Sequence, residues 1–314
     1  MADPARPLQV VAIGEPMLEL RAADAGLMRL AAGGDALNTA IYLARLGVRT
    51  HLLTALGEDP YSDEMIADWT DEGLDSGLIL RHPTRLPGLY AIRTDARGER
   101  RFFYWRGQSA ARALFDLPGT ADALARAETA DWLYLSGITL SIFGPDDRAR
   151  LIALAGRVRA KGGAVAFDPN YRPAGWAKPE EARSAFAAIA PLVTLALPTI
   201  EDEDRLFGPL LPEEHAERWR NYGCAEVVLK CGADGCLVLR KDEPLLLCPP
   251  VAPIEPLDTT GAGDSFNAAY LAGRLAGLSP AHAAAHGNRL AGIVIQHRGA
   301  ILPRAVMPAL ELSR

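Results

Sequence analysis

Short apolar segments alternate with longer segments of helical pattern along most of this 314-residue chain. That alternation is typical of a parallel sheet covered by helices. Several of the helical segments open with proline, which suits the first turn of a helix. We therefore expect an α/β fold, with strands at residues 10–13, 52–55, 132–135, 164–167, 193–197 and 227–229 and helices at residues 35–46, 60–72, 145–161, 179–189 and 212–222.

One part of the chain interrupts this alternation. Residues 89–94 and 101–105 are rich in apolar and aromatic side chains and flank a turn-like sequence at 95–99, which predicts a β-hairpin. Residues 15–30 also lack a helical period and could join the hairpin in a small sheet that projects over the core as a lid. A hairpin packed on the main domain, or a sheet that pairs with a second subunit, fits the same pattern. We expect lid segments at about residues 15–32 and 86–110, within a single domain of residues 1–314.

Charge and composition exclude several classes of function. The formal net charge is −6 and no basic block offsets it, which argues against nonspecific binding to nucleic acid. Residues 1–7 lack the apolar core of a signal peptide, and no apolar run approaches the roughly 20 residues of a membrane span. We therefore expect a cytoplasmic protein with no nucleic-acid or membrane partner. The cysteines lack C-x-x-C spacing, so free thiols are favoured over a zinc site.

Residues 258–266, with the sequence Asp-Thr-Thr-Gly-Ala-Gly-Asp-Ser-Phe, carry the strongest chemical signal. They open an apolar helix, and Gly261 and Gly263 let a ligand approach the unpaired N–H groups of its first turn. Such a cradle suits phosphate, and Asp264 beside it could orient a hydroxyl for attack on a phosphoryl group. The alternative is an ordinary turn in which Asp264 only caps the helix. Neither a Walker A run nor a protein-kinase glycine loop occurs in the chain.

Two segments far apart in the sequence together resemble a known family. Residues 33–40, Gly-Gly-Asp-Ala-Leu-Asn-Thr-Ala, and residues 258–264 resemble the two signatures of the ribokinase-like (PfkB) sugar kinases. Residues 85–90, 98–106 and 170–173 are similar, more narrowly, to the 2-keto-3-deoxygluconate kinases of that family. The resemblance implies a ribokinase-like fold, in which an α/β domain binds ATP and sugar and a small β-sheet lid closes over the sugar and often forms the dimer contact.

The resemblance also implies catalytic roles at the start of the helix. Asp264 would take the proton from the sugar hydroxyl, while the backbone of Gly261, Ala262 and Gly263 would stabilise charge on the transferring phosphoryl group. A carboxylate near a helix N-terminus should be held ionised, which would make Asp264 a modest base. Because phosphoryl transfer through a loose transition state depends mostly on positioning and charge neutralisation, its main contribution would be to aim the hydroxyl.

Substrate contacts are implied in the first signature, in the lid and after residue 167. Glycines let sugar hydroxyls reach the backbone, an asparagine amide can both donate and accept, and arginine can bind the carboxylate of a sugar acid through two parallel bonds. Without the resemblance, the glycines would suit a tight turn, the tyrosines packing and the arginines solvated surface. The implied sugar-binding residues are Gly33, Gly34, Asn38, Tyr90, Tyr104, Arg106, Asn170, Arg172 and Asp264.

Nucleotide and metal contacts are implied in the last third of the chain. The family's N-x-x-E magnesium motif departs here, with Thr199 at the asparagine position and Asp202 at the glutamate position, so the acid that orders Mg²⁺ through water stays open among residues 201–203. Asp258 and Thr260 resemble part of a site for a monovalent cation such as K⁺. A plain β-turn is the alternative for residues 230–235. The implied ATP-binding residues are Thr199, Lys230, Gly232, Asp234, Gly235, Gly261, Gly263 and Asn288.

The resemblance implies an ATP- and Mg²⁺-dependent kinase that phosphorylates 2-keto-3-deoxygluconate to 2-keto-3-deoxy-6-phosphogluconate. A fructokinase or a kinase of the galactonate epimer is the alternative on the same fold, and a catalytically silent sugar-binding protein is an alternative of another class. An NAD-dependent oxidoreductase is disfavoured because the first strand ends in Gly14-Glu15-Pro16 without G-x-G-x-x-G. We expect a homodimer or higher homo-oligomer that assembles through the lid.

Overall fold

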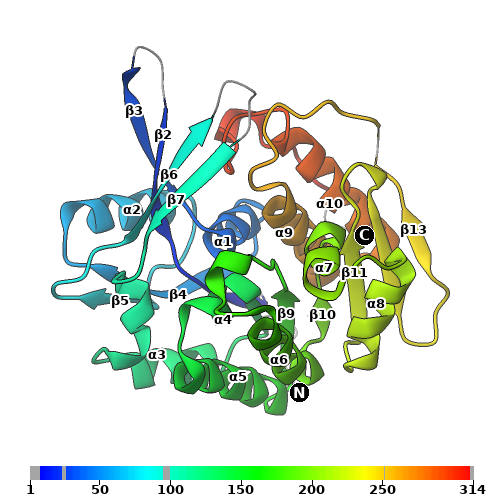
Figure 1. Ribbon diagram of the computed structural model, residues 1–314, viewed down its shortest axis with the longest axis horizontal. Coiled ribbons are helices and arrows are strands. Elements are labelled where there is room, and N and C mark those ends of the chain that lie inside the picture. Colours follow the sequence, from blue (N-terminus) through cyan, green and yellow to red (C-terminus); the bar gives the residue numbers. More distant parts are fainter. Residues whose placement is uncertain (1–7, 23–25, 95–99, 251, 312–314) are drawn as a thin grey trace.

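The computed structural model describes residues 8–22, 26–94, 100–250 and 252–311, which form a large sheet covered by helices and a separate small sheet (Figure 1). The large sheet has nine strands in the order β13-β12-β11-β10-β9-β8-β1-β4-β5, parallel from β5 to β11 and antiparallel beyond β11. Its strands are β1 (Gln9–Ile13), β4 (Arg49–Gly57), β5 (Ile79–His82), β8 (Trp132–Ser136), β9 (Ala164–Asp168), β10 (Leu195–Ala196), β11 (Glu226–Lys230), β12 (Cys236–Arg240) and β13 (Leu246–Cys248).

Helices cover both faces of the large sheet, so its central strands are buried on both sides. Strand β1 shows this directly: Val10 and Ala12 pack in one core cluster, whereas Val11 and Ile13 pack in the other, because successive side chains point to opposite faces. One core is covered by α1 (Asp35–Arg45), α2 (Pro60–Asp71), α9 (Ala262–Leu275) and α10 (Pro280–Val294). The other is covered by α3 (Thr120–Ala127), α4 (Gly137–Ile142), α5 (Pro145–Ala160), α6 (Pro179–Ile189), α7 (Ile200–Phe207) and α8 (Pro212–Asn221).

The expected α/β architecture is confirmed, and the structure adds elements that the pattern did not indicate. The expected strand at 193–197 is shorter, because a 3₁₀ turn that ends at Leu192 still holds the N–H of Val193, which donates to Ala190 O at 3.0 Å. The elements not expected are α3, α4, α7, α10, β5, β12 and β13. The 3₁₀ segments are η2 (Ala110–Asp116), η3 (Pro173–Gly175), η4 (Ala190–Leu192), η5 (Gly232–Asp234) and η6 (Arg304–Val306).

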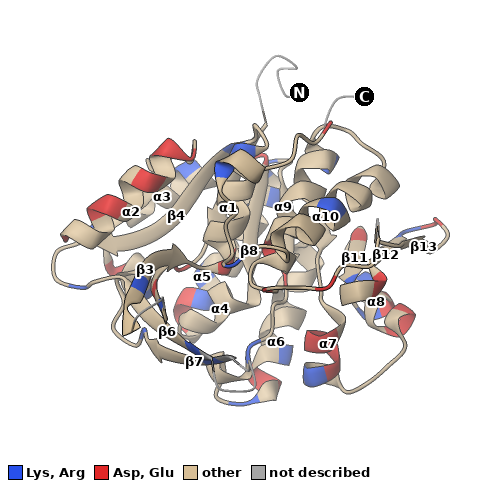
Figure 2. Cartoon of the chain, turned by 90° about the horizontal axis from the view of Figure 1, so that it is seen from above, with Lys and Arg blue, Asp and Glu red and all other residues tan. Residues whose placement is uncertain are grey.

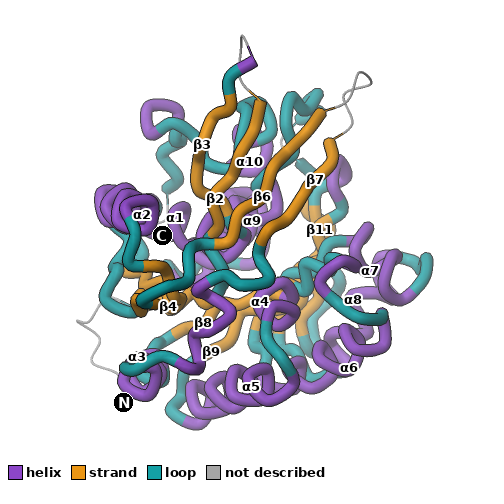
Figure 3. Tube along the Cα trace, turned by 60° about the vertical axis from the view of Figure 1, so that its left-hand side comes forward, coloured by secondary structure: helices purple, strands orange, loops and turns teal. Residues whose placement is uncertain are grey.

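The small sheet contains the hairpin expected from the aromatic segment. Its strands β2 (Met17–Ala22), β3 (Met28–Gly33), β6 (Gly88–Thr94) and β7 (Arg100–Trp105) lie side by side in the order β3-β2-β6-β7, apart from the large sheet (Figure 3). Strands β6 and β7 are antiparallel, and β2 pairs with β6 in parallel. The expected turn at 95–99 lies outside the described residues. We refer to these four strands as the lid.

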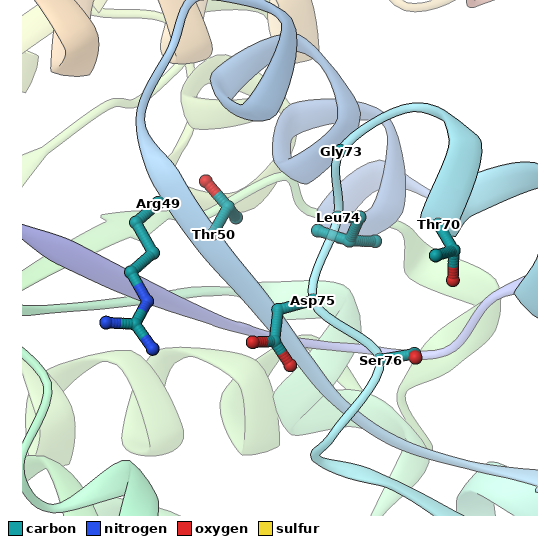
Figure 4. Close-up of a pocket in the computed structure, with 7 residues that line it drawn as sticks. All are labelled: Arg49, Thr50, Thr70, Gly73, Leu74, Asp75 and Ser76. Atoms are coloured by element: carbon teal, nitrogen blue, oxygen red, sulfur yellow. The ribbon is translucent and has the colours of Figure 1, made fainter.

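Parallel strands bring residues from distant parts of the sequence to one edge of the large sheet. Glu15 follows β1, Asp168 ends β9 and Lys230 ends β11, so all three lie at the carboxyl ends of neighbouring or nearby strands, where α/β proteins bind ligands. A pocket of about 430 Å³ (Figure 4) is lined in part by Arg49 and Thr50 at the start of β4. It therefore lies at the amino ends of the parallel strands, away from Glu15, Asp168 and Lys230. In the described part of the chain, no helix is long and apolar enough to traverse a bilayer.

Candidate active site

The N-terminus of α9 presents backbone N–H groups without a side-chain cap. Gly261 occupies the N-cap position with φ of 75°, and the first helical bond runs from the N–H of Ser265 to Gly261 O at 2.9 Å. A Cβ on Gly261 would lie 2.7 Å from the carbonyl oxygen of Ala300, so both the backbone conformation and the close approach require glycine. This helix N-terminus, at which the anion cradle is expected, has no side-chain cap, and Gly263 adds no side chain to it.

Asp258 braces the loop that leads into this cradle. Its Oδ1 accepts from the N–H and the hydroxyl of Thr260 at 2.9 and 2.7 Å, and its Oδ2 accepts from the N–H of Gly299 at 2.9 Å. Asp258 and Thr260, the predicted residues of a monovalent-cation site, are thus in contact with each other. Within the described residues, no group of three or more His, Cys, Asp or Glu side chains is arranged to hold a metal ion.

Asp264 lies in the first turn of α9 and contacts the first helix of the chain. The amide of Asn38 on α1 donates to Asp264 Oδ2 at 2.8 Å, while the Oδ1 of Asn38 is buried and has no partner among the described residues. Burial, together with the negative charges of Asp35 and Asp168, raises the pKa of Asp264 to about 8, against the opposing hydrogen bond from Asn38. Burial and the two neighbouring acids therefore oppose the ionised state that was expected for this carboxylate at a helix N-terminus.

A buried polar network supports the cradle from below. The ammonium group of Lys230 donates to Asp168 Oδ2 at 2.9 Å and to Asn267 Oδ1 at 3.0 Å, and the amide of Asn267 donates to Asp168 Oδ2 at 2.6 Å. Lys230 is only 6% exposed, and a Cβ on Gly263 would lie 3.5 Å from its Nζ. The predicted nucleotide-binding lysine is thus a buried cation beneath the first turn of α9.

The first signature lies against the lid. A Cβ on Gly33 would lie 2.3 Å from the hydroxyl of Tyr90, so glycine leaves the space that this buried tyrosine occupies. The Tyr90 hydroxyl donates to the carboxylate of Glu19, and burial together with that carboxylate raises the pKa of Tyr90. Gly34 caps α1 with φ of 145°, and a Cβ there would lie 2.6 Å from the carbonyl oxygen of Glu15.

Both arginines predicted to bind a sugar-acid carboxylate are paired with acids. Arg106 directs Nε, at 2.7 Å, and Nη2 to Glu15 Oε2. Arg172 directs Nη1 to both carboxylate oxygens of Asp202, at 2.9 and 2.8 Å. Burial raises the pKa of Tyr104 while the charges of both arginines oppose that rise, so the two guanidinium groups act on the same phenol of the lid.

Asn170 connects the two acids that flank Asp264. Its side-chain amide donates to Asp35 Oδ2 at 2.8 Å, and its N–H donates to Asp168 Oδ1 at 3.1 Å. Its φ of 33° is unusual for a residue other than glycine and is compatible with the turn that directly follows β9. The predicted sugar-site asparagine therefore lies at the centre of the acidic cluster.

The predicted nucleotide residues gather around η5 and the end of β13. Thr199 caps α7 and forms a bridge with Lys230, while Gly232 and Asp234 lie in η5 and are exposed. A Cβ on Gly235 would lie 2.2 Å from the carbonyl oxygen of Cys248. The amide of Asn288 donates to the carbonyls of Cys248 and Pro249, at 3.0 and 3.1 Å, and so ties α10 to the same chain segment.

Comparison with known proteins agrees with this geometry. The family described as pfkB family carbohydrate kinase matches residues 8–306. This chain belongs to the pfkB family.

A 2-dehydro-3-deoxygluconokinase from Dickeya dadantii is 45% identical over 306 residues, which cover 96% of this chain and 98% of that protein. The crystal structure of a PfkB protein from Polaromonas sp. JS666 is similar with a TM-score of 0.81 and 27% identity, over 95% of this chain and 98% of that one. The structure of a putative ribokinase II from E. coli in complex with ATP and Mg²⁺ is similar in fold, with a TM-score of 0.79 and 22% identity over 93% and 94% of the two chains.

Three consecutive acids of this pfkB family member differ sharply in their surroundings. Asp202 is held by Arg172 and also accepts from Arg205 at 3.3 Å, so two guanidinium groups cover it. Glu203 is buried against Arg218 at 3.1 Å, and burial raises its pKa to about 7. Glu201 is exposed and its Oε1 would lie 3.4 Å from a Cβ on Gly232, beside η5. Figure 2 shows the acidic residues and the basic end of this short helix, α7.

Motif reasoning missed the acids and amides that surround the motif residues of this pfkB protein. Glu15 pairs with Arg106, Asp168 and Asn267 hold Lys230, and Glu19 accepts from Tyr90. For Asp168 and Glu15, the position relative to the predicted strands could have indicated a place in the site. Asp168 and Glu15 directly end or follow apolar strands, and the carboxyl ends of parallel strands meet at one edge of the sheet.

Proposed function

We propose that this protein phosphorylates 2-keto-3-deoxygluconate with ATP, at the terminal hydroxyl, to give 2-keto-3-deoxy-6-phosphogluconate. The observation that carries the proposal is the placement of Asp264, which lies in an uncapped helix N-terminus and is held by the Asn38 amide. A carboxylate and an anion cradle in one helical turn suit transfer of a phosphoryl group to a hydroxyl. The similar Dickeya dadantii protein, named for this substrate, narrows the choice of sugar.

Asp264 would act as the general base. Since its pKa of about 8 lies near the operating pH, its ionised form accepts a proton more readily than an ordinary aspartate would. The unpaired Oδ1 of Asn38 is an acceptor for a sugar hydroxyl next to that base. The N–H groups at the start of α9, around Gly261, Ala262 and Gly263, would bind the oxygens of the transferring phosphoryl group.

Arg106 and Arg172 would bind the carboxylate that distinguishes a sugar acid from a neutral sugar. Both are held by protein acids, Glu15 and Asp202, so the guanidinium groups are already ordered at the sugar end of the site. A charge-assisted hydrogen bond contributes about 1.5–3 kcal/mol, which corresponds to roughly tenfold to hundredfold discrimination. The sugar pocket would be completed by Gly33, Gly34, Tyr90, Tyr104 and Asn170.

ATP would lie along η5 and the start of α9, where Thr199, Gly232, Asp234, Gly235 and Asn288 line the nucleotide end and Lys230 supports it from below. Mg²⁺ would neutralise charge on the phosphates. The residues fit such an ion in one respect: Glu201 is an exposed carboxylate beside η5, whereas Asp202 is covered by two arginines. We therefore favour Glu201 as the acid that orders Mg²⁺ through water. Asp258 and Thr260 would offer oxygens to K⁺.

A substrate panel tests the proposal most directly. The purified protein should transfer phosphate from ATP to 2-keto-3-deoxygluconate with a kcat/KM at least tenfold above those for the galactonate epimer and for fructose. Turnover of fructose alone would replace the substrate assignment, and binding of both ligands without ADP release would indicate a silent sugar-binding protein.

The lid would also form a subunit contact. Phe102, Phe103 and Trp105 on β7 are 43%, 45% and 62% exposed, an unusual concentration of aromatic surface on an edge strand. We propose a homodimer of single α/β domains through this edge strand. Light scattering after size-exclusion chromatography should give twice the 33.6 kDa chain mass, and Trp105→Glu should shift it to the monomer.

A further inference from the structure

Glu15 is a buried acid that enters the proposed mechanism only as the partner of Arg106. It follows β1 directly, its side chain has no exposed surface, and its only partner among the described residues is Arg106. Both bonds from Arg106 converge on Oε2, whereas Oε1 is buried with no partner in the described part of the chain. Burying an acid with an unsatisfied oxygen costs stability, so packing alone does not explain a glutamate here.

The backbone of the lid makes room for this pair. A Cβ on Gly88, the first residue of β6, would lie 2.7 Å from Glu15 Oε1 and 3.3 Å from the Cβ of Arg106. Only a glycine at this position leaves the pair undisturbed. Strand β6 therefore closes over a preformed carboxylate–guanidinium unit whose two halves come from the core edge and from the segment after β7.

The geometry of the two bonds orients Arg106. The guanidinium group is planar and presents its donors in fixed directions, so Nε and Nη2 bonded to one oxygen fix the plane and leave the other edge, with Nη1, for a second acceptor. The Arg106 Cζ also lies 5.8 Å from the centre of the Tyr104 ring, which supports the group from one side. An arginine held in this way loses little freedom when it binds a ligand.

We propose that Glu15 is a positioning residue that holds Arg106 by one edge, so that the opposite edge is preset to receive the carboxylate of the sugar acid. This inference rests on the proposed function and adds a residue to it. Glu15 acts through Arg106 and contributes to selection of an acidic sugar. Gly88 contributes to the same arrangement, because the absence of a side chain there leaves space for the Glu15–Arg106 ion pair.

A double-mutant cycle on the full-length protein tests this role. Glu15→Ala should raise KM for 2-keto-3-deoxygluconate about tenfold, the loss expected for a charge-assisted bond that is no longer aimed, with KM for ATP within twofold of wild type. Arg106→Ala should raise the sugar-acid KM at least as much, and the double variant should match Arg106→Ala alone. Glu15→Gln keeps an acceptor of the same shape and should stay within about threefold of wild type.

The proposal would be overturned if the increase in KM for the sugar acid in the double variant equalled the product of the increases in the two single variants. Glu15 would then act independently of Arg106. Equal changes in both KM values and in kcat, with a lowered melting temperature, would also overturn it and indicate a structural role. If Glu15→Ala does not fold, Gly88→Ala replaces it in the same cycle, and the double variant of Gly88→Ala with Arg106→Ala must have the same KM for the sugar acid as Arg106→Ala alone. Wild-type activity on the sugar acid reports the proposed function separately from these ratios.

Discussion

The two ends of the candidate site differ in how their charges are balanced. At the start of α9 the helix has no side-chain cap, and Asp264, which lies beside Asp35 and Asp168, accepts from a neutral partner, the Asn38 amide. At the lid end every predicted carboxylate-binding arginine already has an acid: Arg106 is held by Glu15 and Arg172 by Asp202.

This difference suggests that one end of the site determines the rate of phosphoryl transfer and the other determines which sugar binds. An uncompensated base and open N–H groups interact most strongly with charge that develops during phosphoryl transfer, so the α9 end should control kcat. The balanced pairs at the lid end hold their guanidinium groups in place for a carboxylate that only an acidic sugar carries, so this end should control which sugar binds. Four experiments test that separation.

Asp264→Asn should produce the largest effect. Loss of a general base typically lowers kcat by about 10²–10⁴-fold, and the amide keeps the shape and can still accept from Asn38. We expect kcat to fall within that range while isothermal titration gives unchanged Kd values for sugar acid and ATP. Retention of full turnover would remove Asp264 from its catalytic role.

The same variant should also be more stable than wild type at neutral pH. The folded-state pKa of about 8 lies above the unfolded value of about 3.9, so between those values the folded state holds a proton that the unfolded state releases. The contribution of this group to the free energy of unfolding is present in full below the unfolded-state pKa. It is lost as the pH rises through the folded-state pKa. Calorimetry from pH 5 to pH 9 should show a steeper fall in melting temperature for wild type than for Asp264→Asn.

Arg172 should show an intermediate effect confined to the sugar acid. Arg172→Ala should raise KM for 2-keto-3-deoxygluconate roughly tenfold to hundredfold, with the Kd for ATP unchanged. Asp202→Asn should raise that KM severalfold, because it weakens the ion pair that orders Arg172.

Arg205 provides the matched control for that experiment. Like Arg172 it is exposed and contacts Asp202, at 3.3 Å, but it has no predicted contact with the sugar. Arg205→Ala should therefore leave both KM values within twofold. Equal effects of the two arginine replacements would mean that the acid cluster of α7, rather than a specific carboxylate contact, governs substrate binding.

The fold was largely predictable because its signals are local. An apolar run such as Val227–Leu229 and a helix opening such as Pro145 depend on neighbours in the sequence, and the structure contains both elements. Helix α10 was missed because its sequence, PAHAAAHGNRLAGIV, mixes alanine, glycine and histidine without a clear apolar stripe. The short β10 was overestimated because its apolar run continues into a turn.

The site residues that belong to a sequence motif could be predicted. The residues that contact them from other helices and strands could not. The position of Asp264 followed from its glycine-rich motif, but its pKa depends on Asp35 of α1 and Asp168 of β9. In the same way, Arg106 was indicated by resemblance, whereas its pairing with Glu15 joins residues 91 positions apart. Such charge balance depends on tertiary contacts that no local pattern records.

The pH dependence of turnover should give an effect of about tenfold. If ionised Asp264 is the base, kcat/KM should rise with a slope of one as pH increases toward 8 and should level off above it, so the value at pH 7 would be about a tenth of the plateau. Asn38→Ala removes a hydrogen bond that lowers the pKa and should move the midpoint to higher pH. A flat profile between pH 6 and pH 9 would show that proton removal does not limit the reaction.

Two glycines of the cradle should give the smallest effects and separate backbone strain from phosphate access. Gly261→Ala should destabilise the protein by about 1–3 kcal/mol, because its φ of 75° and the 2.7 Å approach of Ala300 O both oppose a side chain. Gly263 lies in regular helix with its nearest neighbour, Lys230 Nζ, 3.5 Å from an added Cβ, so Gly263→Ala should keep or slightly raise the melting temperature.

Activity then distinguishes the two positions. A methyl group at residue 263 narrows the approach to the N–H groups of α9 without straining the backbone, so kcat should fall severalfold in a protein of normal stability. At residue 261 the loss of kcat should follow the loss of stability and be partly recovered at lower temperature. If Gly263→Ala kept full kcat, the phosphoryl group would not approach this turn closely, and the α9 end could not be the part of the site that controls rate.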